Sequence, residues 1–435
     1  MSRRIYFDGL NLALERGTGI ATYARMLVSL GRDLGHEIGV VYGSATRPAK
    51  NPLLREIAFF DRRAVAPAPL PKEVWDAACD LLRTPWGVRP STVELSGTVI
   101  TDQFEGQLPL RDRMFVARNL FGNARRYFSL TGRFAELAFD TAPDILHCTY
   151  QLPLRARAAC NVYTIHDLVP LRLPYATYDN KRLTYRLLRK IAAEADHIVT
   201  VSENSKRDIV RLLGIPEARV TNTYEAVEFP RELTERSDDV VAEQLSGSYR
   251  LEAQDYLLFY GALEPKKNVA RLIDAYMLSG VDIPLVITGA AGWGNRAEQK
   301  LLEELRAAER GWGEGGRRIH HFEYASLPML VALIRGARAV LFPSLYEGFG
   351  LPVLEAMLLG TPVVTSHTSS LPEIAGEAAL YVNPYDIADI ARAIKTVTAD
   401  FDLRRELSER GRRQAEQFSM VRYKERLAAL YEQIG

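Results

Sequence analysis

Short apolar runs alternate with longer amphipathic stretches along the chain, and this alternation is the feature that most restricts the fold. The apolar run at residues 5–8 precedes a helical stretch at 19–35, and a second apolar run follows at 37–42. A short, nearly continuous apolar run is typical of a strand that is buried on both faces of a parallel sheet. Strands and helices that alternate in this order indicate a doubly wound α/β fold.

The alternation occurs in two series that are separated by a break. Residues 228–252 lose the rhythm and carry polar and helix-breaking residues. The 435 residues of the chain also exceed one ordinary core. We therefore predict two Rossmann-like domains, at 1–230 and 253–418, that are joined by a linker at 231–252 and face each other across a cleft. Further strands are expected at 145–148, 162–166, 197–201, 256–260, 285–288, 319–322, 339–342, 362–365 and 379–382.

Composition argues against several classes of partner. The formal charge of +1 gives no overall attraction to nucleic acid. Cys79, Cys148 and Cys160 show no Cys-x-x-Cys spacing, which fits core packing in a reducing compartment. No run approaches the roughly 18 apolar residues of a membrane span, and the first residues lack the apolar core of a signal peptide. A cytoplasmic protein is expected.

The segment at 339–357 carries the most specific chemical pattern. An apolar strand at 339–342 leads into a glycine-rich turn, and Pro352 suits the first position of the helix that follows, because its missing N–H costs nothing there. The free amides and the positive end of the helix would face an anion or a polar sugar. Glu347 lies before the turn and Glu355 on the first turn of the helix, so they would contact different parts of one extended ligand.

This segment closely resembles the donor-site signature of family-4 retaining glycosyltransferases, in which two glutamates eight positions apart enclose Gly-Phe-Gly-Leu-Pro. The resemblance implies the GT-B fold, with a C-terminal helix at 419–435 that packs back on the N-terminal domain. It implies a nucleotide-sugar donor whose ribose hydroxyls bind Glu355. The donor-binding residues that match the signature are Glu347, Gly348, Phe349, Gly350, Leu351 and Glu355.

Two neighbouring lysines are the candidate groups for the donor diphosphate. Lys266 and Lys267 follow the strand at 256–260 and precede a helix at 269–278. Ammonium groups there could neutralise the charge that develops on the leaving group. The alternative is a pair of solvated lysines. The segment 261–268 resembles a family motif in which Lys267 matches the invariant lysine, whereas Lys266 stands where arginine is usual and lacks its bidentate fork.

Three segments of the first domain resemble motifs of the same family. Gly19 belongs to a short glycine loop that enters a helix, although an ordinary strand-to-helix turn would look similar. His166 and Asp167 end a strand, where open sheets place active-site groups. The family resemblance implies that His166 is a catalytic residue near the transferred sugar and that Asp167 orients its ring or serves the acceptor hydroxyl. Ser205 is expected to cap a helix, with Ser202 nearer the acceptor.

The mechanism that the resemblance implies needs neither an enzymic nucleophile nor a metal. The family retains anomeric configuration, apparently by front-face attack in which a phosphate oxygen of the leaving group accepts the proton of the acceptor. Glu347 as a direct nucleophile is the weaker alternative. No Asp-x-Asp motif occurs in a suitable place, because Asp400 and Asp402 belong to a late helical region and are expected at the surface. Neither a metal nor another cofactor is expected.

The identity of the base is left open by the sequence. Gly289 matches the glycine that the family places beside the base pocket. The acidic position that can recognise guanine corresponds to Leu327. The segment at 224–228 also departs from the family pattern, so the hinge and the acceptor side are expected to differ.

Residues 104–134 interleave aromatic side chains with arginines and are the least family-like part of the chain. One interpretation is a basic aromatic surface for an anionic membrane or a polyprenyl diphosphate. The other is an internal helix whose aromatic side chains are core and whose arginines are solvated.

Together these patterns predict a cytoplasmic or peripheral hexosyltransferase that takes mannose from GDP-mannose and extends a lipid-linked or polysaccharide glycan at the cell surface, as in lipopolysaccharide synthesis. A rhamnose or glucose donor is the nearest alternative within the class. A glycosyltransferase-like subunit that binds a partner without catalysis is the alternative from another class. The catalytic residues that we predict are Glu347, His166 and Lys267.

Overall fold

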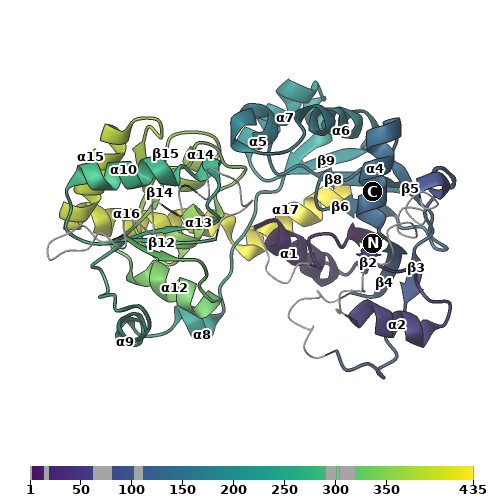
Figure 1. The fold of residues 1–435 in the computed structure, drawn as a ribbon, viewed down its shortest axis with the longest axis horizontal. Helices are drawn as coiled ribbons and strands as arrows, with labels where there is room; N and C mark the ends of the chain where they lie inside the picture. Colours follow the sequence, from purple (N-terminus) through teal and green to yellow (C-terminus); the bar gives the residue numbers. More distant parts are fainter. Residues whose placement is uncertain are drawn as a thin grey trace.

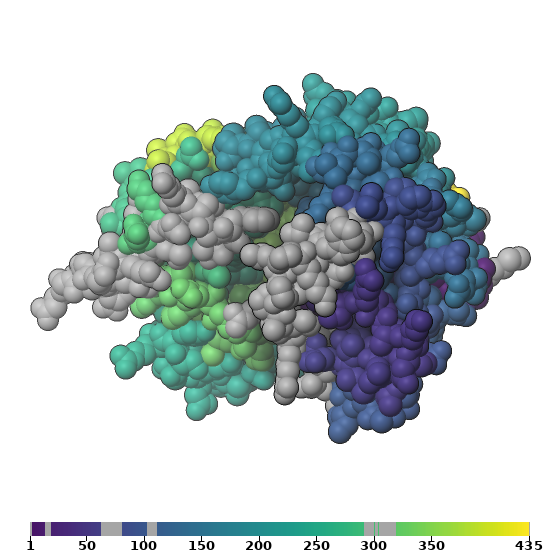
Figure 2. Space-filling view, turned by 45° about the vertical axis from the view of Figure 1, so that its right-hand side comes forward, coloured from purple at the N-terminus to yellow at the C-terminus, as the bar shows by residue number. Residues whose placement is uncertain are grey.

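The computed structural model describes residues 2–13, 19–61, 81–101, 111–290, 300, 303 and 319–434. These residues form two α/β lobes that lie side by side (Figure 1). In the space-filling view, the blue and teal surface of the N-terminal lobe borders the green surface of the C-terminal lobe (Figure 2). The predicted pair of Rossmann-like domains is therefore confirmed.

The N-terminal lobe contains an eight-stranded sheet in the order β10-β9-β8-β6-β1-β2-β4-β3, with only β3 antiparallel to its neighbour among the described strands. The strands of this sheet are β1 (Arg4–Asp8), β2 (Glu37–Ser44), β3 (Ser91–Val93), β4 (Arg113–Arg118), β6 (Ile145–Cys148), β8 (Cys160–Thr164), β9 (His197–Thr200) and β10 (Val220–Asn222). The short strands β5 (Ala135–Leu137) and β7 (Leu154–Ala156) pair separately. The helices are α1 (Gly19–Asp33), α2 (Pro52–Phe60), α4 (Leu120–Thr131), α5 (Val169–Arg172), α6 (Lys181–Glu194) and α7 (Glu203–Leu213).

The C-terminal lobe contains a parallel sheet in the order β13-β12-β11-β14-β15-β16. Its strands are β11 (Leu257–Tyr260), β12 (Leu285–Thr288), β13 (Ile319–Phe322), β14 (Ala339–Phe342), β15 (Val363–Ser366) and β16 (Ala379–Val382). Its helices are α10 (Val269–Ser279), α12 (Leu327–Gly336), α13 (Leu351–Leu358), α14 (Leu371–Ala375), α15 (Ile387–Ala399) and α16 (Phe401–Ala415). The strand order reverses between β11 and β14, and ligands of open α/β sheets bind at such a switch point, beyond the carboxyl ends of the strands.

The residues that we expected to form a linker, 231–252, are largely helical. Helices α8 (Arg231–Thr234) and α9 (Asp238–Tyr249) pack against α12 of the C-terminal lobe, and an Arg335 guanidinium nitrogen lies 2.7 Å from an Asp238 carboxylate oxygen. We did not predict α9, because Asp238, Asp239, Ser246 and Gly247 are polar or helix-breaking residues. Its buried residues are Val241 and Leu245. The domain limits at 230 and 252 stay a prediction.

Helix α17 (Met420–Gln433) returns to the N-terminal lobe, as the resemblance implied, and Figure 1 shows it (yellow) beside α1. One face of the helix is buried, with Tyr423 and Leu427 at 0% exposure. The Tyr431 hydroxyl lies 2.9 Å from Nδ1 of His147 on β6. Burial lowers the pKa of His147 to about 3, so this imidazole is neutral and bonds the helix without a charge.

The chain crosses between the lobes twice, and the two crossings touch. Tyr224 lies on the first crossing, after β10, and Phe418 lies just before α17; their ring centroids are 5.3 Å apart. Phe349 of the glycine-rich turn contacts both rings, at 6.5 Å from Tyr224 and 5.6 Å from Phe418. The Arg426 guanidinium covers the Tyr224 ring at 4.8 Å. We call Tyr224, Phe349 and Phe418 the crossing cluster.

Most aromatic side chains in the described part of the aromatic and basic segment, 111–134, are buried, so the interpretation as an exposed aromatic surface is wrong for these residues. Tyr127 and Phe128 of α4 and Phe115 of β4 are buried in the core of the N-terminal lobe. Arg125 and Arg126 are exposed on the opposite side of α4. The segment is amphipathic, and its aromatic side chains face the sheet.

Smaller expectations have mixed outcomes. Ser202, and not Ser205, caps α7, because its hydroxyl accepts a hydrogen bond from the Ser205 amide at 3.0 Å. Pro352 is the second helical residue of α13, after Leu351. Cys148 and Cys160 are free thiols, and Cys79 lies outside the described residues. Among the helices that the structure describes, none is long and apolar enough to cross a membrane.

Candidate active site

The lysine turn and the glycine-rich turn leave the two strands that flank the switch point of the C-terminal sheet. Lys266 and Lys267 follow β11, and Glu347 follows β14. The Leu345 amide donates to the Lys266 carbonyl at 2.8 Å, which joins the two turns directly. Asn268 adds a second link between the two segments, because its side-chain amide donates to the carbonyl of Pro343 at 3.0 Å. The residues predicted to bind the donor diphosphate therefore lie next to those predicted to bind its sugar.

A compact ion cluster lies between these turns. Nζ of Lys267 is 2.7 Å from one Glu347 carboxylate oxygen, and Nζ of Lys266 is 3.5 Å from the other. The Lys267 ammonium also lies 4.5 Å from the centroid of the Phe342 ring, whose face attracts a cation. The Glu347 side chain is only 7% exposed, and the lysine side chains are 18% and 13% exposed. The lysines are thus not the solvated pair of the alternative interpretation.

Electrostatics keeps Glu347 and Lys266 charged. Burial by itself raises the pKa of Glu347, but Lys267 and Lys266 outweigh it and hold this pKa below its usual range. Burial by itself lowers the pKa of Lys266, but the carboxylates of Glu347, Asp167 and Glu264 outweigh it and raise this pKa. A site with two cations and a carboxylate at neutral pH suits a diphosphate beside a polar sugar.

Gly348 brings the N-terminal lobe against this cluster. A Cβ atom on Gly348 would lie 2.7 Å from the His166 carbonyl oxygen and 3.1 Å from Cβ of Asp167, so a side chain at this position would push the lobes apart. The Gly348 carbonyl accepts a hydrogen bond from the Ser202 hydroxyl at 2.6 Å. The structure therefore brings Asp167 and Ser202 of one lobe together with the glycine-rich turn of the other.

His166 lies close to two oxygens of its own lobe. Its Nε2 lies 3.0 Å from the Thr149 carbonyl, and because a carbonyl only accepts, Nε2 carries a hydrogen. Its Nδ1 lies 3.5 Å from a carboxylate oxygen of Glu225, which is 6% exposed. Nδ1 thus faces Glu225 and not Asp167, which instead accepts from the Val169 amide at 2.9 Å. Sequence reasoning noticed only that 224–228 departs from the family pattern.

Glu355 lies on α13, one turn beyond the glycine-rich turn, and interacts with the Tyr260 hydroxyl. Burial raises the pKa of Glu355 from 4.5 to about 7, although Tyr260 and Lys267 oppose this shift. The Tyr260 hydroxyl also donates to the Pro352 carbonyl at 2.7 Å. The second glutamate is therefore partly protonated at neutral pH, in contrast to Glu347.

The remaining predicted residues lie at the same edges of the two sheets. Gly19 begins α1, and a Cβ atom on it would lie 3.0 Å from a Leu351 methyl group of the opposite lobe. Gly289 follows β12, and its amide donates to the Phe322 carbonyl at 2.8 Å. Leu327 is the first residue of α12, whereas Glu323, an exposed acidic residue that sequence reasoning missed, comes directly after β13.

No group of three or more His, Cys, Asp or Glu side chains in the described ranges could hold a metal ion. Asp400 caps α16, because its carboxylate accepts from the Leu403 amide at 2.9 Å, and Asp402 is exposed on the first turn of that helix. The two aspartates are thus accounted for as helix cap and surface. Whether the reaction needs a metal stays a prediction.

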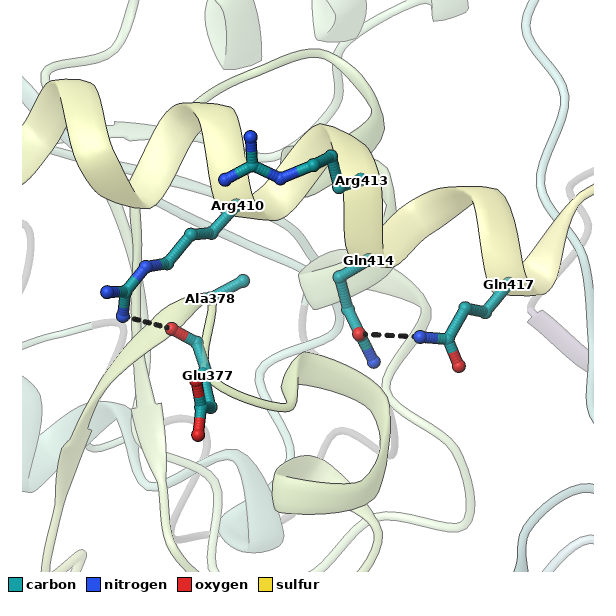
Figure 3. A pocket seen from close by; sticks show the side chains of 6 residues that line it. All are labelled: Glu377, Ala378, Arg410, Arg413, Gln414 and Gln417. Carbon is teal, nitrogen blue, oxygen red and sulfur yellow. Dashed lines mark hydrogen bonds between the residues drawn. The ribbon is translucent and has the colours of Figure 1, made fainter.

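A separate surface pocket of about 310 Å³ lies between α16 and the segment before β16 (Figure 3). An Arg410 guanidinium nitrogen donates to the Glu377 carbonyl at 3.3 Å, and the Gln417 amide donates to the Gln414 side-chain oxygen at 3.1 Å. The pocket contains none of the residues that the sequence predicts for the donor or the acceptor. Its lining residues are Glu377, Ala378, Arg410, Arg413, Gln414 and Gln417.

Comparison with known proteins gives the same assignment for both lobes. Residues 243–414 match the family model of glycosyl transferases group 1, and residues 98–228 match the model of glycosyltransferase family 4. The chain is 35% identical to O-antigen chain mannosyltransferase B of Escherichia coli over 275 residues, which are 62% of this chain and 69% of that protein. It is 29% identical to the serotype-specific mannosyltransferase WbdA of Escherichia coli over 70% of this chain and 40% of that protein.

Solved structures support the fold. A sucrose-phosphate synthase from Thermosynechococcus elongatus superposes with a TM-score of 0.67 at 17% identity, over 99% of this chain and 98% of that one. At this identity the likeness establishes the two-lobed GT-B architecture alone. The sequence relationship goes further, and together with the lysine and glutamate turns at the switch point it shows that the chain belongs to the family-4 glycosyltransferases.

Proposed function

We propose that this protein transfers a hexose from a nucleotide sugar to a glycan acceptor with retention of anomeric configuration. The observation that carries the proposal is the ion cluster of Lys266, Lys267 and Glu347, which lies at the switch point of the C-terminal sheet and against Asp167 of the other lobe. Two cations bind the donor diphosphate, and the carboxylate binds hydroxyls of the sugar. Glu355 and its neighbour Tyr260 bind the hydroxyls of the ribose.

In the chemical step one bond breaks, one bond forms and one proton is transferred. The bond between the anomeric carbon and the phosphate oxygen breaks, and the acceptor oxygen bonds to the same face of that carbon. The acceptor proton passes to an oxygen of the departing phosphate. Lys266 and Lys267 lower the barrier because they are already in place where negative charge develops, in a site that excludes water. His166 forms a wall of the sugar site, and its Nε2 is held by the Thr149 carbonyl.

Mannose from GDP-mannose is the donor that we propose. Two of the relatives are named mannosyltransferases. The position of Glu323 also favours a guanine base. A carboxylate at the carboxyl end of β13 can accept hydrogen bonds from both N1–H and the 2-amino group of guanine, and uracil lacks this pair of donors. The proposed acceptor is a growing lipid-linked or polysaccharide glycan, reached from the cytoplasmic side of a membrane, and the proposed reaction needs no metal.

A donor panel tests this proposal directly. Purified protein is incubated with GDP-mannose, UDP-glucose or dTDP-rhamnose, with and without manno-oligosaccharide acceptors, and released nucleoside diphosphate is measured. We expect release from GDP-mannose that acceptor stimulates. Release from another donor alone would replace mannose by glucose or rhamnose. Absence of release from every donor, with intact folding, would favour a catalytically inactive partner subunit instead.

A further inference from the structure

The side chain of Tyr346, next to Glu347, crosses from the C-terminal lobe to helix α7 of the N-terminal lobe. Its hydroxyl donates to a carboxylate oxygen of Asp208 at 2.5 Å and lies 3.2 Å from the side-chain amide of Asn204, which donates to it. The same Asp208 oxygen lies 3.3 Å from Nε of Arg172. Tyr346 and Asp208 are 5% and 8% exposed. A continuous polar chain therefore links the glycine-rich turn to the other lobe.

Packing leaves the Tyr346 ring little freedom. It lies in a small apolar cluster with Leu345 and with Val169, Leu173 and Ala176 of the N-terminal lobe. Burial, with the Asp208 carboxylate adding to it, raises the pKa of Tyr346, so the hydroxyl keeps its proton and acts as a donor. A fixed ring with a fixed hydrogen bond determines where the backbone before Glu347 can lie.

The backbone around Glu347 is anchored on its other side by the C-terminal lobe. The Glu347 amide donates to the Ser369 hydroxyl at 3.0 Å, and the Glu347 carbonyl accepts from the Ser370 hydroxyl at 3.0 Å. Those serines can hold the turn whichever way the lobes are placed. The Tyr346–Asp208 bond, by contrast, exists only when α7 lies against the turn.

We propose that Tyr346 and Asp208 are positioning residues that fix the Glu347 turn in its reactive orientation only while the N-terminal lobe, which carries the acceptor side, is in contact with it. This inference rests on the proposed function. In that arrangement the sugar, the lysines and the acceptor hydroxyl are aligned together. Without it, the donor still binds, but fewer bound molecules reach the geometry of transfer. Small displacements of this kind can cost up to about 10²-fold in rate.

The test is Tyr346→Phe, which keeps the packed ring and removes the bonded hydroxyl. Tyr256→Phe is the matched control, because Tyr256 is also buried and its hydroxyl donates to the Leu333 carbonyl at 2.6 Å inside the C-terminal lobe. We expect kcat for transfer from GDP-mannose to fall about tenfold or more in Tyr346→Phe, with the Kd for GDP within about twofold. The control should keep its kcat even where its Tm falls.

Asp208 provides a second pair of variants. Asp208→Asn retains an oxygen that can accept from Tyr346 and should keep more of kcat than Asp208→Ala. The double variant Tyr346→Phe/Asp208→Ala should lose little more of kcat than either single variant, because both changes remove the same Tyr346–Asp208 hydrogen bond. Fully additive losses of kcat, or equal losses in Tyr346→Phe and its control, would overturn the proposal.

Hydrogen exchange separates this inference from the proposed function. Amides of residues 344–350 should exchange at least about threefold faster in Tyr346→Phe than in Tyr256→Phe, whether or not any donor is turned over. Unchanged exchange would refute the positioning contact. Faster exchange in a protein that uses no donor would refute the proposed function and leave the contact standing.

Discussion

Lys267 is the group nearest to Glu347, and at the scale of single residues it gives the sharpest prediction. Lys267→Ala should lower turnover about 10²-fold or more, because a fixed cation at the leaving group stabilises charge that develops only in the transition state. Folding should suffer less, since Lys266 still faces the Glu347 carboxylate at 3.5 Å. The comparison is kcat and Tm of this variant against Lys395→Ala, which removes an exposed lysine of α15. Near-normal transfer by folded Lys267→Ala would remove the lysine from its proposed role.

Substitutions of Glu347 and Glu355 should have different effects on ligand affinity. Glu355→Gln should weaken both GDP and GDP-mannose, because the ribose is present in each ligand. Glu347→Gln should weaken GDP-mannose more than GDP, because its carboxylate serves the sugar. Titration calorimetry with the two ligands measures the four affinities. Equal effects of both substitutions on the affinity for GDP would contradict this division.

The raised pKa of Glu355 also predicts a pH dependence of stability. A carboxyl whose pKa rises from 4.5 to about 7 on folding binds its proton more tightly in the folded state. Its contribution to the free energy of unfolding therefore falls as pH rises through this window. Glu355→Gln, which mimics the protonated form, should match the Tm of the wild-type protein near pH 4.5 and exceed it at pH 8. A Tm difference that does not change with pH would mean that Glu355 ionises normally.

At the scale of elements, α17 should contribute much of the stability of the N-terminal lobe. Leu427 is 0% exposed, so Leu427→Ala should cost about 2–5 kcal/mol of unfolding free energy through lost burial and a residual cavity. Val421→Ala on the same helix should cost little, because Val421 is 67% exposed. Urea denaturation followed by circular dichroism gives both values. A similar small loss in both variants would mean that the helix packs loosely on the lobe.

The elements also show what a sequence can and cannot reveal here. Buried parallel strands such as β11, β12 and β14 were predictable, because each is a continuous apolar run before a turn. Strands β5 and β7 were not, because three residues carry no periodic signal. The glycine-rich turn at 347–351 was predictable from local spacing, and its role as a donor site stays a prediction from the family resemblance. The contact of Tyr346 with Asp208 was not, because it joins residues 138 positions apart and depends on how the lobes meet.

At the scale of the whole molecule, we propose that Lys266 and Lys267 supply the positive charge that the donor diphosphate needs. Excess EDTA should therefore leave the transfer rate within about twofold, a small change beside the several kcal/mol that a catalytic metal supplies. The assay compares initial rates with and without chelator, and with added Mg²⁺ or Mn²⁺. Activity that EDTA abolishes and a metal restores would mean that Lys266 and Lys267 have been given the wrong role.

The crossing cluster has a mechanical consequence for the same two lobes. Because both chain crossings meet at Tyr224 and Phe418, a rotation of one lobe against the other has its axis near these rings. Displacement in a rotation grows with distance from the axis. Phe349 contacts both rings, so the turn that carries Glu347 lies close to the axis and is displaced little. The outer rims of the lobes lie far from the axis and are displaced most. Such a rotation would thus change the gap between the rims of the lobes far more than it displaces Glu347.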